Sequence, residues 1–444
     1  MVRTSAERPL LPPLRVLDLT TELGAFAGKV LGDLGADVVK IEPPGGDPDR
    51  MLGPFWNDEP NPNRSLRWWS ANTSKRSAVV DIGQPEGRET FLRLVRSADF
   101  VLESFPPGQM ASHGLGWDDL ARANPRLILV SMTPYGQVGP RANEPVSDLV
   151  LMSMGGMTYL CGDEGHPPVT VAVPQSYYHV GAEGAEAALI AYFARKRTGQ
   201  GQWVDVNGQA CIAWTLLSEI PMADATFHNA PSRRSGPVRE RGVLRSRTVF
   251  PCADGYVNFL VAGGSAFAGT IRHLIAWMDS EGEAPDFLKE IDWMTWSIEA
   301  FAFLHPPEEH PAIQQQVERV EGAFAAFFAR RTKEELLAGA AQWQVMLGPL
   351  LTIDDLLVNR QLQSSGYWVP VEHEDIGVTV RYPGVLARSN VGGGMIRRRP
   401  PNIGEHTFEV LEEYGLGRDE IEHLAAAGVT SIPVGAQGHR ESGR

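Results

Sequence analysis

Three adjacent side chains near the middle of the chain are able to exchange protons. His179 follows Tyr177 and Tyr178, and an imidazole beside two phenols can serve as an acid and base pair in a racemase or lyase reaction. A histidine that is hydrogen-bonded for structural reasons is the alternative. Glu183 and Glu186 follow on the same predicted helix, near its N-terminus, where acids also interact favourably with the helix dipole.

Cations are concentrated at two places in the sequence. Lys75 and Arg76 adjoin at the start of a predicted strand, where they either clamp a phosphate or form a solvated basic tip. A second group, in residues 231–247, either receives a carboxylate or belongs to a solvent-facing linker. Its members are Arg233, Arg234, Arg239, Arg241, Arg245 and Arg247.

The elements that must position these residues alternate between strand and helix. An apolar run from Leu14 to Leu19 stops at Thr20-Thr21, which we expect to cap a helix over 23–35. Further strands are predicted over 38–41, 77–82, 99–102, 127–132 and 203–206, and further helices over 86–97, 118–124 and 180–196. This pattern predicts a parallel sheet covered on both faces, with ligands in the loops after Asp18, Ile41, Glu103 and Met132.

The first strand and helix lack the turn that binds a dinucleotide. Gly24 and Gly28 are four residues apart, which is not the GxGxxG spacing that lets a backbone approach a pyrophosphate. Glu42 occupies the place of a ribose-binding acid, but it is only half of that fingerprint. The sequence also has no P-loop and no HExxH, so it does not indicate a nicotinamide enzyme, a P-loop nucleotidase or a zinc protease.

Composition narrows the class of protein further. The chain has 444 residues, 43% of them hydrophobic, and a formal net charge of −14, which excludes a disordered chain and argues against a phosphate-backbone binder. The three cysteines, Cys161, Cys211 and Cys252, lack the short spacings of metal or redox sites, so we expect free thiols and no metal. The polar N-terminus and the absence of a long apolar run predict a cytoplasmic protein without a membrane span.

An ordered set of short segments resembles the class III CoA-transferase family, which includes formyl-CoA transferase, carnitine CoA-transferase and alpha-methylacyl-CoA racemase. Each segment is weak alone, but the set runs in family order from about residue 14 to residue 428. The segments are Leu14–Thr20, Leu31–Asp47, Lys75–Asp81, Pro85–Gly87, Leu115–Gly116, Asn124–Leu127, Tyr135–Pro140, Arg197–Asp205, Gly404–Thr407 and Glu409–Leu411.

The resemblance implies a fold and a coenzyme site. It implies a large Rossmann-like α/β domain, residues 1–225 and 346–444, a smaller inserted α/β domain, residues 226–345, and two chains interlocked as rings. It places CoA at the edge of the N-terminal sheet, where the family pattern departs at Ser104, which replaces an asparagine, and near Ser112, where an arginine is replaced. The residues it implies for CoA are Glu42, Asn72, Lys75, Arg76, Ser104, Phe105 and Tyr135.

The resemblance also implies a nucleophile that this chain lacks. The family's aspartate precedes by four residues a glycine at the start of the Ala-rich helix, and that count from Gly181 gives Tyr177. The aspartate forms a mixed anhydride with the acyl group and then a thioester with CoA. A phenol, with a pKa of about 10, forms an ester instead. The nearest acids in the sequence are Asp163, Glu164, Glu183 and Glu186, and Glu183 is the one considered as a displaced nucleophile.

Three hypotheses follow from this substitution. The favoured one is the non-nucleophilic subunit of a heteromeric CoA-transferase, as in benzylsuccinate CoA-transferase, moving CoA between an acyl-CoA and a small carboxylic acid. The second is a self-sufficient transferase with a displaced carboxylate, or a racemase that uses His179. The third is a CoA-binding protein without turnover. The homologous partner would be an aspartate-bearing subunit or a second copy, and neither nucleic acid nor a membrane is expected.

Overall fold

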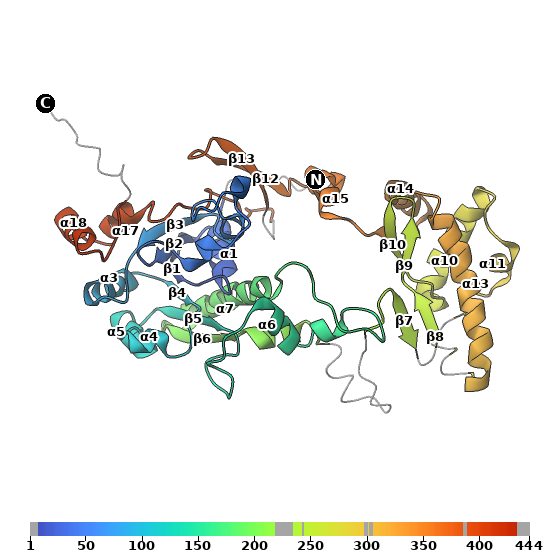
Figure 1. Cartoon of the computed structure of the whole chain (residues 1–444), viewed down its shortest axis with the longest axis horizontal. Coiled ribbons are helices and arrows are strands. Elements are labelled where there is room, and N and C mark those ends of the chain that lie inside the picture. The colour runs from blue at the N-terminus through green and yellow to red at the C-terminus, as the bar shows by residue number, and fades with distance from the viewer. Residues whose placement is uncertain are drawn as a thin grey trace. The chain divides into compact units, whose positions relative to one another are not determined.

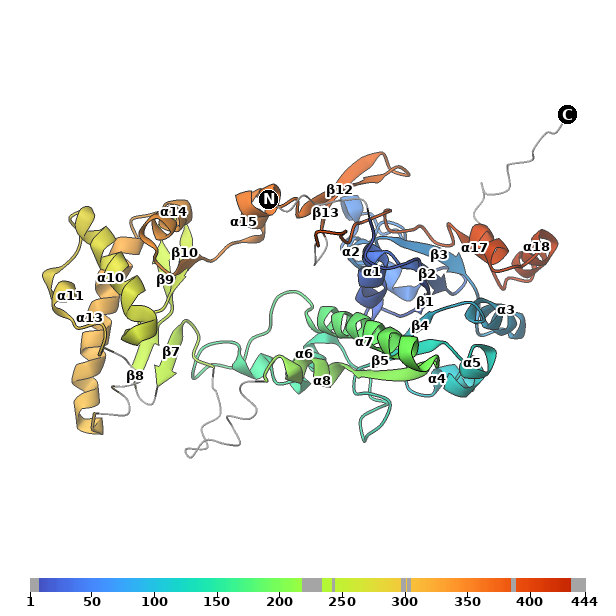
Figure 2. The same ribbon diagram turned by 180° about the vertical axis from the view of Figure 1, so that it is seen from behind.

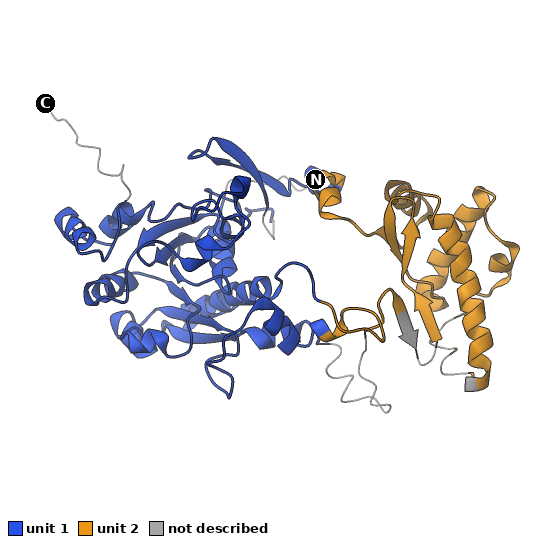
Figure 3. Ribbon diagram, in the orientation of Figure 1, with its two compact units in different colours: residues 1–158, 170–229, 361–444 blue, residues 159–169, 230–360 orange. Residues whose placement is uncertain are grey.

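The computed structural model describes residues 8–217, 234–241, 244–296, 301, 305–384 and 389–432 (Figure 1, Figure 2). The chain divides into two compact units (Figure 3). Unit 1 comprises residues 1–158, 170–229 and 361–444, and unit 2 comprises residues 159–169 and 230–360. Each unit has its own hydrophobic core, so each is described by itself.

Unit 1 contains a six-stranded sheet in the order β3-β2-β1-β4-β5-β6, and every neighbouring pair is parallel. Leu17 of β1 lies beside Val39 of β2 and Val101 of β4. The predicted parallel sheet is therefore confirmed, and its order is that of a doubly wound fold. The strands are β1 (Arg15–Leu19), β2 (Asp37–Glu42), β3 (Lys75–Val79), β4 (Phe100–Glu103), β5 (Ile128–Thr133) and β6 (Gln202–Asn207).

Helices cover both faces of this sheet. On one face, α1 (Ala25–Leu34) and α7 (Ser176–Thr198) pack over Val16, Val38 and Val130 with α6 (Asp148–Met154) and α8 (Gly208–Trp214) nearby. The opposite face, with Leu17 and Val101, is covered by α3 (Pro85–Val95), α5 (Trp117–Ala123) and, from the end of the chain, α17 (Thr407–Glu413) and α18 (Arg418–Ala426) (Figure 2). Apolar side chains alternate between the faces because neighbouring strand residues point oppositely.

Two glycines allow α7 to lie close to its neighbours. A Cβ at Gly181 would stand 2.7 Å from the Cβ of Phe26 in α1, and one at Gly184 would stand 2.3 Å from Met132 Sδ in β5. The start of α7 is thereby held near the start of α1. The expected threonine cap of α1 is wrong, because its N-cap is Gly24 without a side-chain bond, and Thr20 instead donates to Asp18, at 2.6 Å.

The shorter elements of unit 1 complete it. The antiparallel hairpin of β12 (Trp368–His373) and β13 (Val378–Pro383) packs Val371 and Tyr382 against Trp68 and Trp69 of α2 (Leu66–Ala71). The predicted start of β3 is corrected from Ser77 to Lys75. The remaining described helices are α4 (Gln109–Ser112) and two 3₁₀ turns at Pro48–Met51 and Trp56–Asp58. A third 3₁₀ turn at Thr158–Leu160 and α16 (Arg360–Ser364) span the boundary with unit 2.

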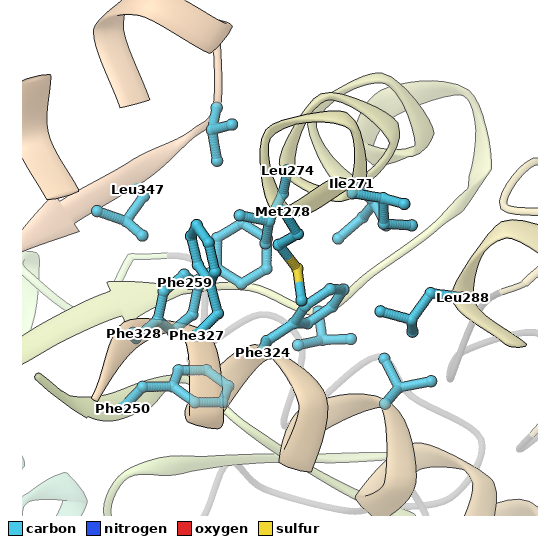
Figure 4. Packing of buried hydrophobic residues seen from close by; sticks show 14 of the residues in the cluster. Phe250, Phe259, Ile271, Leu274, Met278, Leu288, Phe324, Phe327, Phe328 and Leu347 are labelled. Atoms are coloured by element: carbon cyan, nitrogen blue, oxygen red, sulfur yellow. The ribbon is translucent and has the colours of Figure 1, made fainter. Parts of the chain in front are cut away.

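Unit 2 packs helices against a small antiparallel sheet. The sheet has β10 (Gly255–Phe259) between β9 (Val249–Cys252) and β11 (Leu347–Pro349), and it packs with α10 (Gly264–Ser280), α13 (His310–Phe328) and α14 (Lys333–Trp343). Phe250, Phe259, Phe324, Phe327 and Phe328 are fully buried between these elements (Figure 4). The other elements are β7 (Val238–Arg241), β8 (Leu244–Arg247), α11 (Asp286–Glu290), a 3₁₀ turn at Pro307–Glu309 and α15 (Ile353–Val358).

Candidate active site

The loops after β1 and β4 meet where the strand order reverses direction. The backbone N–H of Thr21 donates to Ser104 Oγ at 2.7 Å, and the two hydroxyls lie 3.0 Å apart. Phe105 follows, and its N–H donates to Glu103 Oε2 at 2.8 Å. Doubly wound sheets bind ligands in the crevice outside this switch point. Ser104 and Phe105 therefore lie at the predicted ligand edge.

Glu103 is a buried acid at the same edge. Burial raises its pKa to about 7, although hydrogen bonds from Ser131 and from the backbone of Phe105 oppose the rise. Ser131 also accepts the indole N–H of Trp203 at 2.9 Å. Glu103 is therefore partly protonated at neutral pH, and its charge changes with pH in the physiological range.

Lys75 and Asn72 belong to a buried ionic network beneath α1. Lys75 Nζ lies 2.8 Å from Asp18 Oδ2 and donates to Asn72 Oδ1 at 2.8 Å. Lys40 Nζ lies 2.9 Å from Asp47 and 4.0 Å from Asp18. Burial raises the pKa of Asp18, but the charges of Lys75 and Lys40 outweigh this and hold that pKa below its ordinary value. Lys75 thus neutralises an internal carboxylate.

Glu42 is held by an arginine rather than facing solvent. Arg50 Nε and Nη2 donate to its two carboxylate oxygens at 2.6 and 2.7 Å, and both side chains are fully buried. The hydroxyl of Ser77 and the backbone N–H of Asp47 also donate to Glu42. The loop from Glu42 to Arg50 is consequently fixed at the carboxyl end of β2.

Arg76 points to the opposite face of the sheet from Lys75. Its guanidinium pairs with Asp37 at 2.7 Å, with Glu409 at 2.8 Å and with Glu413 at 2.9 Å. The last two acids lie on α17, so Arg76 joins the end of the chain to β3. Because both cations are buried, the solvated basic tip considered from the sequence is excluded. Each charge is paired within the chain.

Tyr135 begins the glycine-containing loop after β5. Its side chain is buried, and its carbonyl accepts a bond from Asn207 Nδ2 at 2.9 Å. Gly136 has a φ of 81° and packs beside Asp205 and Asn207, where a larger residue would be strained. The loop is anchored to β6 at this end, while Val138 at its tip is exposed.

Asp148 positions the start of α7 and therefore Tyr177. The N-cap residue Gln175 makes no side-chain cap of its own, but Asp148 Oδ1 accepts the backbone N–H groups of Gln175 and Ser176, both at 2.8 Å. A carboxylate there also interacts favourably with the helix dipole. Burial, with the charges of Glu22 and Asp148, raises the pKa of Tyr177, so its phenol is protonated at neutral pH.

A cavity of about 450 Å³ lies beside Tyr177 and Tyr178. Glu22, from the loop after β1, and Arg67, from α2, form an ion pair in its wall. Their side chains are 24% and 34% exposed, so the pair opens to the cavity. The rest of the wall is mostly apolar and is formed by Phe26, Gly53, Pro54, Leu66, Ser70, Ala71, Val173 and Pro174.

The other residues singled out on α7 do not line this cavity. Glu183 lies near Cys211, whose thiol pKa is raised to about 12 by burial and by that acid, and Glu186 is exposed beside Ile190 and Phe193. His179 is partly buried on the first turn, and its backbone N–H donates to the Gln175 carbonyl. Among the described residues, the charged groups that line the cavity with the two tyrosines are therefore Glu22 and Arg67. The spacing of residues along α7 could not predict this ion pair.

Glu22 and Arg67 are the residues of this cavity that sequence reasoning missed. Glu22 carries a usable signal, because it follows β1 at the edge where ligands were expected. Arg67 carries none, since the short helix α2 lies between two predicted strands and was not anticipated. The pair brings together residues separated by 45 positions only after α1 and α2 have packed.

The arginines of residues 231–247 are distributed over unit 2. Arg245 lies 3.4 Å from Glu164, and Arg247 lies over the ring of Phe250. Arg234 donates to the His166 carbonyl at 3.0 Å. Arg239 and Arg241 lie on β7, and Arg233 is outside the described residues.

Neither a metal centre nor a membrane helix is found in the part of the chain that the structure describes. Over these residues, no three His, Cys, Asp or Glu side chains converge as a metal ion would require. None of the described helices combines the length and apolar character that crossing a bilayer demands.

A family model and the sequences of known proteins both match nearly the whole chain, and both name CoA-transferases. Residues 11–407 match the model of CoA-transferase family III. The chain is 34% identical to succinyl-CoA:(R)-benzylsuccinate CoA-transferase subunit BbsE of Thauera aromatica, over 93% of this chain and 96% of that one. It is 28% identical to the beta subunit of succinyl-CoA–L-malate CoA-transferase of Chloroflexus aurantiacus, with coverage of 93% and 96%.

A solved structure shares this fold. The CAIB/BAIF family protein from Brucella suis superimposes with a TM-score of 0.74 at 26% sequence identity. The match covers 92% of this chain and 100% of that protein.

Proposed function

Because the chain belongs to CoA-transferase family III, we propose that it is the subunit of such a transferase that lacks the nucleophilic aspartate. The enzyme would move CoA between an acyl-CoA and a carboxylic acid, with a homologous, aspartate-bearing chain as partner. Tyr177 carries the proposal: it lies on the first turn of α7 beside a cavity, at the position where the family resemblance predicts the aspartate.

The chemistry of the phenol supports this assignment. In the family reaction a carboxylate oxygen attacks the acyl carbonyl, the CoA thiolate leaves, and the thiolate then attacks the resulting anhydride. The Tyr177 phenol is protonated at neutral pH because its pKa is raised by burial and by neighbouring acids. It would yield an ester, which is far less reactive toward a thiolate than an anhydride.

The relatives support a heteromer. The names of two of them, BbsE and the malate transferase beta subunit, describe subunits of CoA-transferases. We propose that this chain likewise assembles with a homologue, as two interlocked rings, with an interface of an obligate complex, above about 2,000 Å². A stable monomer of 48.5 kDa at micromolar concentration would contradict the assembly.

We propose the carboxyl edge of the unit 1 sheet as the place of CoA. Ser104, Phe105 and Tyr135 lie in the loops after β4 and β5. Glu42, Asn72, Lys75 and Arg76 are held by internal bonds, so they would act by fixing the loops that receive the coenzyme. Their part in CoA binding stays a prediction.

The decisive experiment compares the chain alone with the chain and its aspartate-bearing homologue. The chain alone should transfer no CoA from any acyl-CoA and should show no adduct that hydroxylamine or borohydride can trap. Activity should appear when the homologue is added, because one nucleophile suffices in a heteromer. Co-purification at native expression identifies that homologue.

Substitution of Tyr177 gives the converse experiment. Tyr177→Asp restores the reactive group without the surroundings that would orient and desolvate it, so at most a trace of transfer is expected from the chain alone. Tyr177→Asn is the matched control, of similar size but without an acid. Robust turnover by the unmodified chain would sink the proposal, and mapping the trapped adduct to Glu22, Glu183 or Glu186 would then identify a displaced nucleophile.

A further inference from the structure

The cavity beside Tyr177 combines one cation with an aromatic wall. Arg67 is the one Lys or Arg among its lining residues, all of which lie in the described chain. Phe26 and Tyr178 meet edge to face in the wall, with ring centroids 5.4 Å apart. The volume of about 450 Å³ suits a small organic molecule of roughly phenyl size.

The cation of this cavity is occupied by an internal carboxylate. Glu22 pairs with Arg67 through Nε, and a guanidinium can bind a ligand carboxylate equally well at the same group. Both side chains are partly exposed to the cavity, so the pair can open without breaking into the core. Glu22 is therefore placed as a competitor for any acid that enters.

We infer that Arg67 is the carboxylate-recognising residue of this cavity and that a ligand acid displaces Glu22 from it. The ligand class is a carboxylic acid with an aromatic or bulky apolar body. The inference rests on the proposed function, because it names the class of carboxylic acid that would exchange CoA. It assigns the recognition of that acid to Arg67 and Glu22 and not to the position of the nucleophile.

The displaced glutamate must be neutralised, because the surroundings are acidic. The charged groups facing Glu22 are Arg67, Asp49 and Asp148, and Tyr177 faces it from α7. Asp49 accepts the backbone N–H of Glu22. A ligand carboxylate on Arg67 would bring to four the carboxyl groups around one cation, its own and those of Glu22, Asp49 and Asp148, so Glu22 takes up one proton from solvent as the ligand binds.

The ionisation of these acids supports such an exchange. Burial raises the pKa of Glu22, with a further contribution from Asp49 and against the charge of Arg67. Burial and Asp47 likewise raise the pKa of Asp49. Losing Arg67 to a ligand raises the pKa of Glu22 again. Binding is therefore coupled to proton uptake, and affinity falls as the pH rises through the range between the free and bound pKa values.

A titration with 3-phenylpropionate tests the inference on the full-length chain without CoA. Calorimetry in two buffers of different ionisation enthalpy, near pH 5.5 and near pH 7.5, should show tighter binding at the lower pH and about one proton taken up per ligand. The amide, 3-phenylpropionamide, has the same body without the charge. It should bind independently of pH and of Arg67.

Two variants separate the roles of the pair. Arg67→Gln should weaken binding of the acid at least about tenfold, and Arg67→Lys should recover part of it. Glu22→Gln should tighten binding near pH 7.5 severalfold and abolish the pH dependence. Arg64→Gln is the matched control, because Arg64 precedes α2 and pairs with Glu59 outside the cavity lining. It should bind like the original chain.

Three outcomes would overturn the inference: no binding of the acid by the unmodified chain at millimolar concentration, unchanged binding in Arg67→Gln, or weaker binding in Glu22→Gln. If Arg67→Gln does not fold, Arg67→Lys and Glu22→Gln still decide. The result is independent of the subunit proposal, since binding is read without turnover. If the chain alone proves to be an active enzyme, the titration still tests the role of Arg67. If the titration fails, the proposal that Tyr177 cannot act as the nucleophile is unaffected.

Discussion

Two Glu–Arg pairs in unit 1 have the same chemistry and opposite surroundings. Glu42 and Arg50 are fully buried, and the five donors of the guanidinium are satisfied largely by Glu42, by main-chain carbonyls and by Asn63. Glu22 and Arg67 open to a cavity. The comparison shows that residue type alone does not separate a structural cation from a ligand-binding one; exposure and the number of competing partners do.

The difference has an energetic reason. Removing one partner of a buried pair leaves an unpaired charge in a medium that cannot solvate it, whereas the partner in an open pair is rehydrated. Arg50 also lies 3.9 Å over the ring of Trp68, which adds a stacking contact. A buried pair therefore fixes a loop, and an open pair can be exchanged.

The largest effect is expected for Arg50→Met. The substitution keeps much of the apolar stem but leaves the Glu42 carboxylate buried without a counter-charge, so unfolding free energy should fall by about 3 to 5 kcal/mol. Urea denaturation measures it. A double variant with Glu42→Gln should recover part of the loss, and a decrease below about 1 kcal/mol would show that the pair does not hold this edge.

A second effect, of intermediate size, concerns Glu103. Its pKa of about 7 is above that of an unfolded glutamate, so the folded chain binds an extra proton between the two values. Stability from this group is present below the unfolded pKa and is lost as pH rises through 7, by about 2 to 3 kcal/mol between pH 5 and pH 8. Glu103→Gln should remove that dependence.

Denaturation at several pH values measures the Glu103 effect. Glu89→Gln is the matched control, because Glu89 is exposed on α3 and should leave the pH profile unchanged. Equal pH profiles for the original chain and Glu103→Gln would show that the acid is ordinary, and that the switch point does not titrate near neutrality.

The sequence predicted what depends on local patterns. Apolar runs over β1, β2 and β5 and the helical spacing of α1 identified the parallel sheet and its ligand edge. The cap of α1 and the start of β3 were wrong, because bonds to Asp18 and to distant strands override local preference at element ends. The ion pairs of Lys75 and Arg76 depend on side-chain direction, which needs the register of three strands.

The cavity beside Tyr177 could not be predicted from the sequence, because its residues come from distant parts of the chain. Asp148 caps α7 from 27 residues away, and Arg67 reaches Glu22 across α1 and α2. Such contacts exist only once the helices have packed. That Tyr177 stands at the aspartate position is a prediction from the family pattern, while its neighbours Glu22 and Asp148 came from the structure.

The smallest effect is expected for the partly exposed pair of Glu22 and Arg67. A double-mutant cycle of Glu22→Gln and Arg67→Gln should give a coupling energy of about 1 kcal/mol or less, since the pair is partly exposed and solvent replaces each partner. The same cycle on Glu42 and Arg50 should give several times more. Unfolding in urea near pH 7.5 measures both cycles. A coupling for Glu22 and Arg67 as large as that of the buried pair would mean that no ligand acid can compete for Arg67, because the exchange would cost as much as opening the core.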